Sequence, residues 1–194
     1  MTFPATEPRQ CLMVSQITAI HRLVWTGLLA ALMAAGAAIT IPLGPLSPVP
    51  VTLQTLFVQL AGLVLGPRGG LMAVGLYLLA GALGLPVFSG GKGGLAVLFG
   101  PTGGFLWGFL PAVVCCGLAS GKADPPAWMV LGYCFLGTSV LLVFGAFYLA
   151  LVTGISPGKA FAVGALPFLP GAVAKCLVSL AVYRFLAKGR LLPQ

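Results

Sequence analysis

The chain has 194 residues, of which 59% are hydrophobic and 6% are charged, and its mean hydropathy is +1.11. A soluble domain carries about 25% charged residues, so this composition excludes a water-soluble globular protein and indicates a membrane protein. The net charge of +8 does not indicate a nucleic-acid-binding protein, because the basic residues are scattered singly rather than clustered on one face.

Six apolar stretches predict an all-α, polytopic integral membrane protein with six transmembrane helices. The stretches 23–41 and 128–152 hold no charge and are long enough for a bilayer core, which needs roughly 20 residues. The chain therefore divides into a cytoplasmic N-terminal segment (1–22), a single membrane domain (23–187) and a cytoplasmic tail (188–194). We expect the spans near 23–42, 52–65, 71–85, 101–119, 127–152 and 167–187.

The basic residues predict the orientation of these spans. With a cytoplasmic N-terminus, Lys92 and Lys159 lie outside and Lys175 lies within the last span. The positive-inside rule then places both termini in the cytoplasm, in a cytoplasmic (inner) membrane. The basic residues on the inside are Arg9, Arg22, Arg68, Lys122, Arg184, Lys188 and Arg190.

The first span is rich in small residues. Ala30, Ala34 and Ala38 share one helix face, with Ala31 and Ala35 beside them. Small residues four apart let two membrane helices approach closely. This face either docks a partner or packs against the protein's own helices, and the spacing does not say which.

The second and third spans are short and are joined by the turn sequence "GPRGG", residues 66–70. The glycine-rich segment 84–100 follows, between the third and fourth helices. Non-helical backbone is tolerated at membrane depth only where protein buries it or where it lines a cavity. We therefore expect an outer loop, or a loop that dips back between the helices and approaches its neighbours closely.

The last span is expected to start near Pro170, because proline is favourable in the first turn of a helix and costly inside it. A short interfacial piece then precedes it. This start places Lys175 roughly one and a half turns inside the outer end of the helix, near the glycine-rich segment.

Residues suited to catalysis are almost absent. The only carboxylates are Glu7 and Asp124, and the single histidine, His21, precedes the first span. The lysine in "GGKGG" does not fit a Walker A motif, because Pro86 replaces its first glycine and Gly93 its Ser or Thr. The five cysteines show no C-x-x-C pattern. We therefore expect no enzyme, no cofactor and no metal site.

A binding site remains. An ionisable residue inside the membrane is functional by default, and no carboxylate is placed to neutralise Lys175 there, so an anionic ligand is the natural partner. The alternative is that its ammonium group reaches the interface along the helix. Lys92 is a second cation on the same side. The aromatic residues that are candidates for the walls of a pocket are Tyr77, Phe88, Phe99, Phe105 and Trp107.

Three stretches closely resemble a known family. They are "SPVPVTLQTLFVQLAGLVLGPRGG", "YLLAGALGLPVFSGGKGGLAVLFGPTGGF" and "PFLPGAVAK". In this order they resemble the hallmark sequences of the BioY family, the biotin-binding substrate (S) components of energy-coupling factor (ECF) transporters. The resemblance covers about residues 30–186. It implies six helices, cytoplasmic termini, and a biotin pocket near the outer face that is capped by the loop between the first two helices.

The resemblance also implies a set of site residues. The segment 100–104 shapes the pocket wall, and Lys175 matches the lysine of the family's "PG-D-x-x-K" signature. The chain departs from that signature at Ala172, where the family usually has an aspartate suited to the ureido N–H groups of biotin, and Ser89 stands where many relatives are expected to carry an amide. The expected ligand-binding residues are Gln54, Tyr77, Phe88, Ser89, Gly90, Lys92, Thr102, Gly103 and Lys175.

The function implied is biotin uptake, with the chain acting as the S component of an ECF-type transporter or alone. The partners implied are a transmembrane T component, docked by the alanine face of the first helix, and two ATPase subunits, or further copies of the chain. An S component for another vitamin is one alternative. A structural membrane subunit that binds no small ligand is the other, and it leaves the glycine-rich segment and Lys175 without a role.

Overall fold

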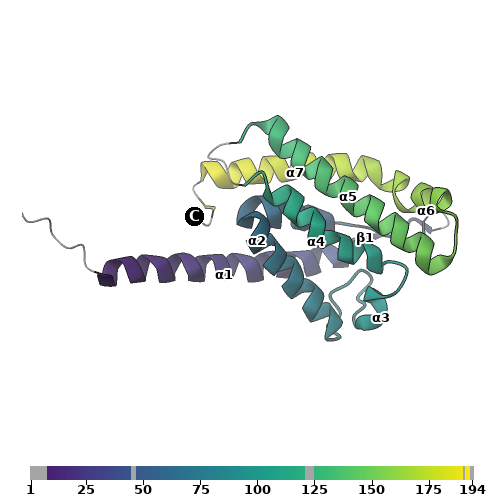
Figure 1. The fold of residues 1–194 in the computed structure, drawn as a ribbon, viewed down its shortest axis with the longest axis horizontal. Coiled ribbons are helices and arrows are strands. Elements are labelled where there is room, and N and C mark those ends of the chain that lie inside the picture. The colour runs from purple at the N-terminus through teal and green to yellow at the C-terminus, as the bar shows by residue number, and fades with distance from the viewer. Residues whose placement is uncertain (1–7, 45–46, 121–124, 190, 193–194) are drawn as a thin grey trace, which may run out of the picture.

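The computed structural model describes residues 8–44, 47–120, 125–189 and 191–192, with side chains from residue 19 onward. Over these residues the fold is helical apart from one small antiparallel sheet, which confirms the predicted all-α class (Figure 1). The elements are α1 (Pro8–Ala38), β1 (Thr40–Ile41), β2 (Val51–Thr52), α2 (Gln54–Ala82), α3 (Leu95–Leu98), α4 (Gly103–Gly117), α5 (Ala127–Thr153), α6 (Pro157–Gly164), the 3-10 helix η2 (Leu166–Phe168) and α7 (Leu169–Lys188).

Helix α1 is longer than the first expected span. It starts at Pro8, and its N-terminal part projects past the other helices (Figure 1). Within the part of α1 whose side chains the structure describes, Ala19–Ala38 is long and apolar enough to cross a membrane. The helix starts earlier than position 23 because no glycine or further proline stands before Gly27 to end it.

The alanine face of α1 packs mainly inside the protein. Ala30 is buried in the core, and Ala34 is half-buried against it. Ala38 is exposed, as are Ala31 and Ala35 on the adjacent face. Of the two roles that the sequence left open for the face of Ala30, Ala34 and Ala38, the structure therefore favours internal packing for its first two residues.

Helix α2 folds back on itself at Gly66, whose φ of 72° and ψ of −177° are not helical. A Cβ built on Gly70 would lie 3.2 Å from the Cα of Gly62. In a straight helix residues eight apart are separated by about 12 Å along the axis, so α2 bends sharply at Gly66 and its two halves meet beside the bend. The chain therefore changes direction where the sequence predicted a turn, but the break lies at Gly66, and residues 67–70 already belong to the second half of α2.

Among the described residues, four helical stretches are long and apolar enough to cross a membrane by length and composition. Helix α4 is apolar but shorter. Six crossings result if α4 and each half of α2 cross separately, in addition to the crossings of α1, α5 and the stretch that contains α7. This count remains a prediction. The four stretches are Ala19–Ala38, Gln54–Ala82, Ala127–Thr153 and Pro157–Lys188.

The glycine-rich segment and the two residues after it, here called the glycine loop (residues 84–102), pack on the end of α2. An isolated antiparallel bridge joins Phe88 to Lys92, and the short helix α3 follows. The backbone N–H of Gly94 donates to the carbonyl of Gly81 over 2.7 Å. Gly81 also lets the ring of Phe88 lie directly on α2, because a Cβ there would be 2.0 Å from that ring.

The C-terminal third confirms the expected start of the last helix. Helix α7 begins at Leu169, with Pro170 in its first turn, and α6 and η2 form the short piece before it. Lys175 therefore lies in the second turn of α7. Helix α7 is in contact with α5, which it crosses at an angle in the view of Figure 1.

A buried polar cluster links three helices beneath the site described below. The Nε2 atom of Gln59 on α2 donates to the hydroxyl of Thr138 on α5 over 2.8 Å. The hydroxyl of Ser179 on α7 donates to Oε1 of Gln59 over 2.7 Å. Since each of these side chains has partners, the cluster joins the helices without leaving a buried polar group unpaired.

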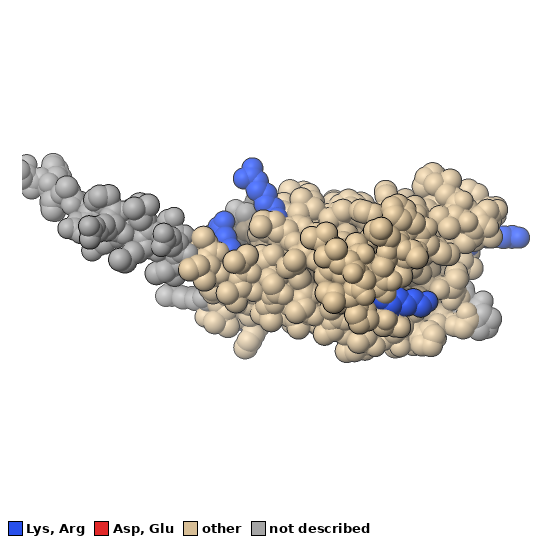
Figure 2. Space-filling model, turned by 90° about the horizontal axis from the view of Figure 1, so that it is seen from below, with Lys and Arg blue, Asp and Glu red and all other residues tan. Residues whose placement is uncertain are grey.

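The surface suits a lipid environment. On the face in Figure 2, basic side chains stand singly and most of the surface with assigned colour is uncharged. Large exposed hydrophobic side chains occur on α1, α2, α5 and α7, among them Leu79, Phe147 and Leu177. An exposed apolar surface of this extent is stable in a bilayer and not in water.

Candidate ligand-binding site

A cavity lies among the loop between α1 and α2, the start of α2, the glycine loop, α4, α5 and the start of α7. Its volume is about 140 Å³, far above the roughly 10–15 Å³ that one water molecule needs. The cavity is therefore large enough to hold more than a single water molecule, which makes it the candidate site for a ligand. Its lining residues are Pro48, Val49, Pro50, Thr52, Gln54, Thr55, Phe88, Ser89, Lys92, Val97, Thr102, Phe105, Leu106, Phe109, Leu141, Leu142, Phe168 and Lys175.

The described part of the loop between α1 and α2, here called the lid (residues 39–44 and 47–53), covers one side of the cavity. Its strands β1 and β2 pair with each other, and the buried side chain of Val49 points into the lining. The hydroxyls of Thr40 in the lid and Ser89 in the glycine loop lie 3.2 Å apart and share a hydrogen bond. The lid and the glycine loop are thus joined over the ligand space.

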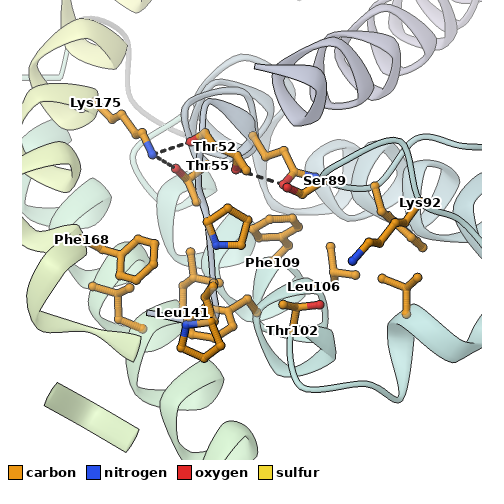
Figure 3. A pocket seen from close by; sticks show the side chains of 18 residues that line it. Thr52, Thr55, Ser89, Lys92, Thr102, Leu106, Phe109, Leu141, Phe168 and Lys175 are labelled. Carbon is orange, nitrogen blue, oxygen red and sulfur yellow. Dashed lines mark hydrogen bonds between the residues drawn. The ribbon is translucent and has the colours of Figure 1, made fainter. Parts of the chain in front are cut away.

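Lys175 is held by two neutral acceptors. Its Nζ donates to the backbone carbonyl of Thr52 over 2.6 Å and to the hydroxyl of Thr55 over 2.8 Å (Figure 3). Sequence reasoning considered a carboxylate or a ligand anion as the partner of this ammonium group, and these two neutral acceptors were not predicted. Its charge is nevertheless not neutralised by a carboxylate within the described residues, because the chain's only two, Glu7 and Asp124, lie outside them.

Lys92 lines the other end of the cavity. Figure 3 shows it across the ligand space from Lys175. Its side chain is exposed. Within the described part of the chain, its ammonium group makes no hydrogen bond or ion pair. The cavity therefore has one buried cation with fixed partners and one cation at the exposed end that is available to a ligand.

Gln54 is the most buried polar side chain in the lining, at 4% exposure. Its Oε1 accepts a hydrogen bond from the hydroxyl of Thr52 over 3.0 Å. Its Nε2 donates to the hydroxyl of Tyr77, which in turn donates to the backbone carbonyl of Val87 over 3.1 Å. Tyr77 is buried behind Gln54 and also packs edge-on against Phe88, with ring centroids 5.6 Å apart.

Six of the nine expected ligand-binding residues line the cavity: Gln54, Phe88, Ser89, Lys92, Thr102 and Lys175. The other three do not. Tyr77 lies behind the wall, and Gly90 is an exposed turn residue with φ of 75°. Gly103 starts α4, where it packs against the carbonyl of Leu98.

The aromatic candidates separate in the same way. Phe88 and Phe105 line the cavity. Phe99 is 64% exposed, and Trp107 instead donates its ring N–H to the carbonyl of Leu98 over 3.1 Å. Sequence reasoning missed Thr55, the lid residues 48–50 and 52, and apolar residues of α3, α4, α5 and η2. Nothing distinguishes these apolar residues in a chain that is apolar throughout.

Ala172 stands one turn before Lys175 on α7 and is buried. Residues three apart on a helix are neighbours, so a carboxylate at this position would lie beside the ammonium group. Here a methyl group takes its place. Thr52, Gln54 and Thr55 therefore provide the acceptors at this end of the cavity.

Comparisons with known proteins agree on one family. The BioY family profile matches residues 9–191. The chain is 43% identical over 150 residues to "Biotin transporter BioY" of Thermotoga maritima, covering 77% of this chain and 86% of that protein. It is 42% identical over 176 residues to "Biotin transporter BioY" of Rhizobium etli, covering 86% and 93%. The crystal structure of the S-component for biotin from an ECF-type ABC transporter superposes with a TM-score of 0.80 at 27% identity, covering 95% of each chain.

Proposed function

This chain belongs to the BioY family, and on that basis we propose that it is a transport protein that captures biotin at the outer side of the cell membrane for uptake. It acts by binding rather than by catalysis. The observation that carries the proposal is the cavity itself, which has apolar walls and a lysine at each end.

The two ends of biotin match the two ends of this cavity. Biotin has an apolar fused ring with a polar ureido group at one end and a carboxylate on a flexible chain at the other. Burying a carboxylate costs far more than burying a neutral group. We therefore assign the carboxylate to Lys92 at the exposed end and the ureido group to the buried end near Lys175.

The donor count of Lys175 supports this orientation. An ammonium group has three N–H donors, and two of them are used by Thr52 and Thr55. One donor remains, which suits the single carbonyl oxygen of a ureido group. A carboxylate at this end would compete with both protein acceptors.

The proposal is tested by binding measurements on the detergent-purified protein with biotin and biotin amide. Wild type is expected to prefer biotin over the amide by about tenfold or more, since charge-assisted hydrogen bonds contribute about 1.5–3 kcal/mol. Lys92→Met should lose this preference. The control, Lys159→Met, removes an exposed lysine of α6 that does not line the cavity and should keep it. A wild-type protein that binds no biotin would contradict the proposed function.

We further propose that both termini lie in the cytoplasm and that the cavity opens to the outside of the inner membrane. The distribution of basic residues supports this orientation, although Lys122 and Arg190 lie outside the described residues. A reporter fused at Gln194 should be active only on the cytoplasmic side. A Gly158→Cys variant should be labelled from outside more than the parent chain. A C-terminal reporter active outside would contradict this orientation.

As partners we infer a T component and two ATPase subunits, or additional copies of this chain. The exposed alanines of α1, Ala31, Ala35 and Ala38, form a face that leaves room for a close helix contact. Mass spectrometry of the gently purified protein distinguishes these assemblies, since co-purifying subunits identify the first and a multiple of the chain mass the second.

A further inference from the structure

The orientation of the Gln54 amide is determined by one proton. A glutamine amide can be placed either way round, and its hydrogen-bond partners decide which end faces which neighbour. Val87 offers a backbone carbonyl, which only accepts, so the single proton of the Tyr77 hydroxyl is donated to it. The oxygen of Tyr77 must then accept from Gln54, and this turns the NH₂ group of Gln54 toward Tyr77.

The consequence lies on the cavity side. With its NH₂ group held by Tyr77, Gln54 presents its carbonyl oxygen toward Thr52, and both residues line the cavity. A carbonyl oxygen has two lone pairs, and Thr52 uses one of them. The other is available to an N–H donor of a ligand, at the end of the cavity where Ala172 leaves no carboxylate.

We propose that Tyr77 is a positioning residue, which fixes the amide of Gln54 so that its oxygen accepts a hydrogen bond from a ureido N–H of the ligand. This proposal rests on the proposed function. It assigns the selection for an N–H donor to the amide oxygen of Gln54. Tyr77 itself does not touch the ligand. It acts through Gln54 and at the same time anchors the glycine loop at Val87.

A purely structural role for Tyr77 is the competing explanation, because its ring also packs on Phe88. The two roles differ in what they select. A residue that only supports the wall changes the affinity for all ligands alike. A residue that fixes an acceptor changes the discrimination between ligands that do and do not carry the N–H donor.

The experiment measures biotin affinity against two analogues in which one or the other ureido N–H is replaced by oxygen, giving cyclic carbamates of nearly the same shape. Wild type is expected to discriminate against at least one carbamate. Tyr77→Phe keeps the ring contact and removes the hydroxyl, so the discrimination should fall by about twofold to tenfold, the range for one neutral hydrogen bond. The ratio of biotin to desthiobiotin, which keeps both N–H groups, should not change.

Two further variants separate the explanations. Tyr148→Phe removes a hydroxyl that also donates to a glycine-loop carbonyl, that of Phe99 over 3.3 Å, but far from Gln54 in the chain and outside the lining. It should keep wild-type discrimination. Gln54→Leu should abolish the discrimination, and adding Tyr77→Phe to it should have no further effect on the ratio.

The measured ratio is the affinity for biotin divided by the affinity for the carbamate. The proposal is overturned if Tyr77→Phe leaves this ratio unchanged or if Tyr148→Phe lowers it equally. It is also overturned if Tyr77→Phe still changes the ratio in a protein that already carries Gln54→Leu. If thermal unfolding shows that Tyr77→Phe is not folded, the test uses Gln54→Leu. Discrimination against the carbamates that is retained in Gln54→Leu would show that the Gln54 oxygen is not the acceptor, and would overturn the proposal. Wild-type protein that binds no biotin would instead refute the proposed function, so the two failures are distinguishable.

Discussion

Replacing Lys175 with methionine is expected to weaken biotin binding by about tenfold to somewhat over a hundredfold. Methionine keeps most of the apolar stem and removes the ammonium group. Hydrogen bonds to a charged group contribute about 1.5–3 kcal/mol, and each 1.4 kcal/mol is a factor of ten. The substitution also removes the link from α7 to the lid at Thr52. Equilibrium binding of biotin to the purified variant measures the effect.

A matched control for this variant is Lys188→Met, which removes an exposed lysine at the other end of the same helix. It should bind biotin as wild type does. Biotin amide separates the two lysines of the cavity, because Lys175→Met should keep the preference for the free acid that Lys92→Met loses. Unchanged biotin affinity in Lys175→Met would show that Lys175 serves the fold and not the ligand.

Replacing Gly103 with alanine is expected to disrupt the connection between the glycine loop and α4. A Cβ at this position would lie 1.9 Å from the carbonyl oxygen of Leu98 and 2.6 Å from its carbonyl carbon. Both are backbone atoms, so no side-chain rotation relieves the contact. Overpacking of this kind typically costs about 1–3 kcal/mol and sometimes more. Because Val97 and Thr102 line the cavity on either side, biotin affinity should fall together with the unfolding temperature.

The control is Gly132→Ala in α5, where a Cβ would meet nothing within 4 Å. Alanine is more favourable than glycine inside a helix by about 1 kcal/mol, so this variant should be as stable as wild type or more stable. Equal unfolding temperatures for the two variants would show that the backbone before α4 moves to accommodate the added Cβ without loss of stability. That result would contradict the packing role assigned to Gly103.

The sequence predicts the residues of the site whose chemistry is unusual for their surroundings. Lys175 and Lys92 are noticeable because charges are rare in this chain, and both line the cavity. The partner of Lys175 is a different case. It is the backbone carbonyl of Thr52, which lies 123 residues away in the chain. Every residue has such a carbonyl, so no sequence pattern marks this one.

Tyr77 shows a second limit of sequence reasoning. Its residue type is appropriate for a pocket wall, and it lies close to the pocket, but the structure places it behind Gln54 rather than beside the ligand space. Tyr77 and the lining residue Gln54 belong to the same helix, and both carry polar groups suited to a pocket. Only their contacts, which depend on how the glycine loop packs on α2, distinguish them.

Helix α1 shows why its start was not predicted. The expected span began at Leu23, where the polar residues end, because hydropathy reports which residues suit the bilayer. Helix formation depends on the backbone, and Pro8 is favourable at a first helical position. Nothing between Pro8 and Leu23 interrupts the helix. The residue at which an apolar stretch begins therefore need not be the residue at which the helix begins.

The turn of α2 at Gly66 affects whether the number of membrane crossings before the glycine loop is odd or even. A continuous helix of this length would cross the bilayer once, whereas two halves folded together cross twice or not at all. An odd count in place of an even one would reverse the sidedness of every later segment, and the mouth near Lys92 would then face the cell interior. If both halves of α2 cross the membrane, the bend at this single glycine, with φ of 72°, determines which side of the membrane the cavity faces.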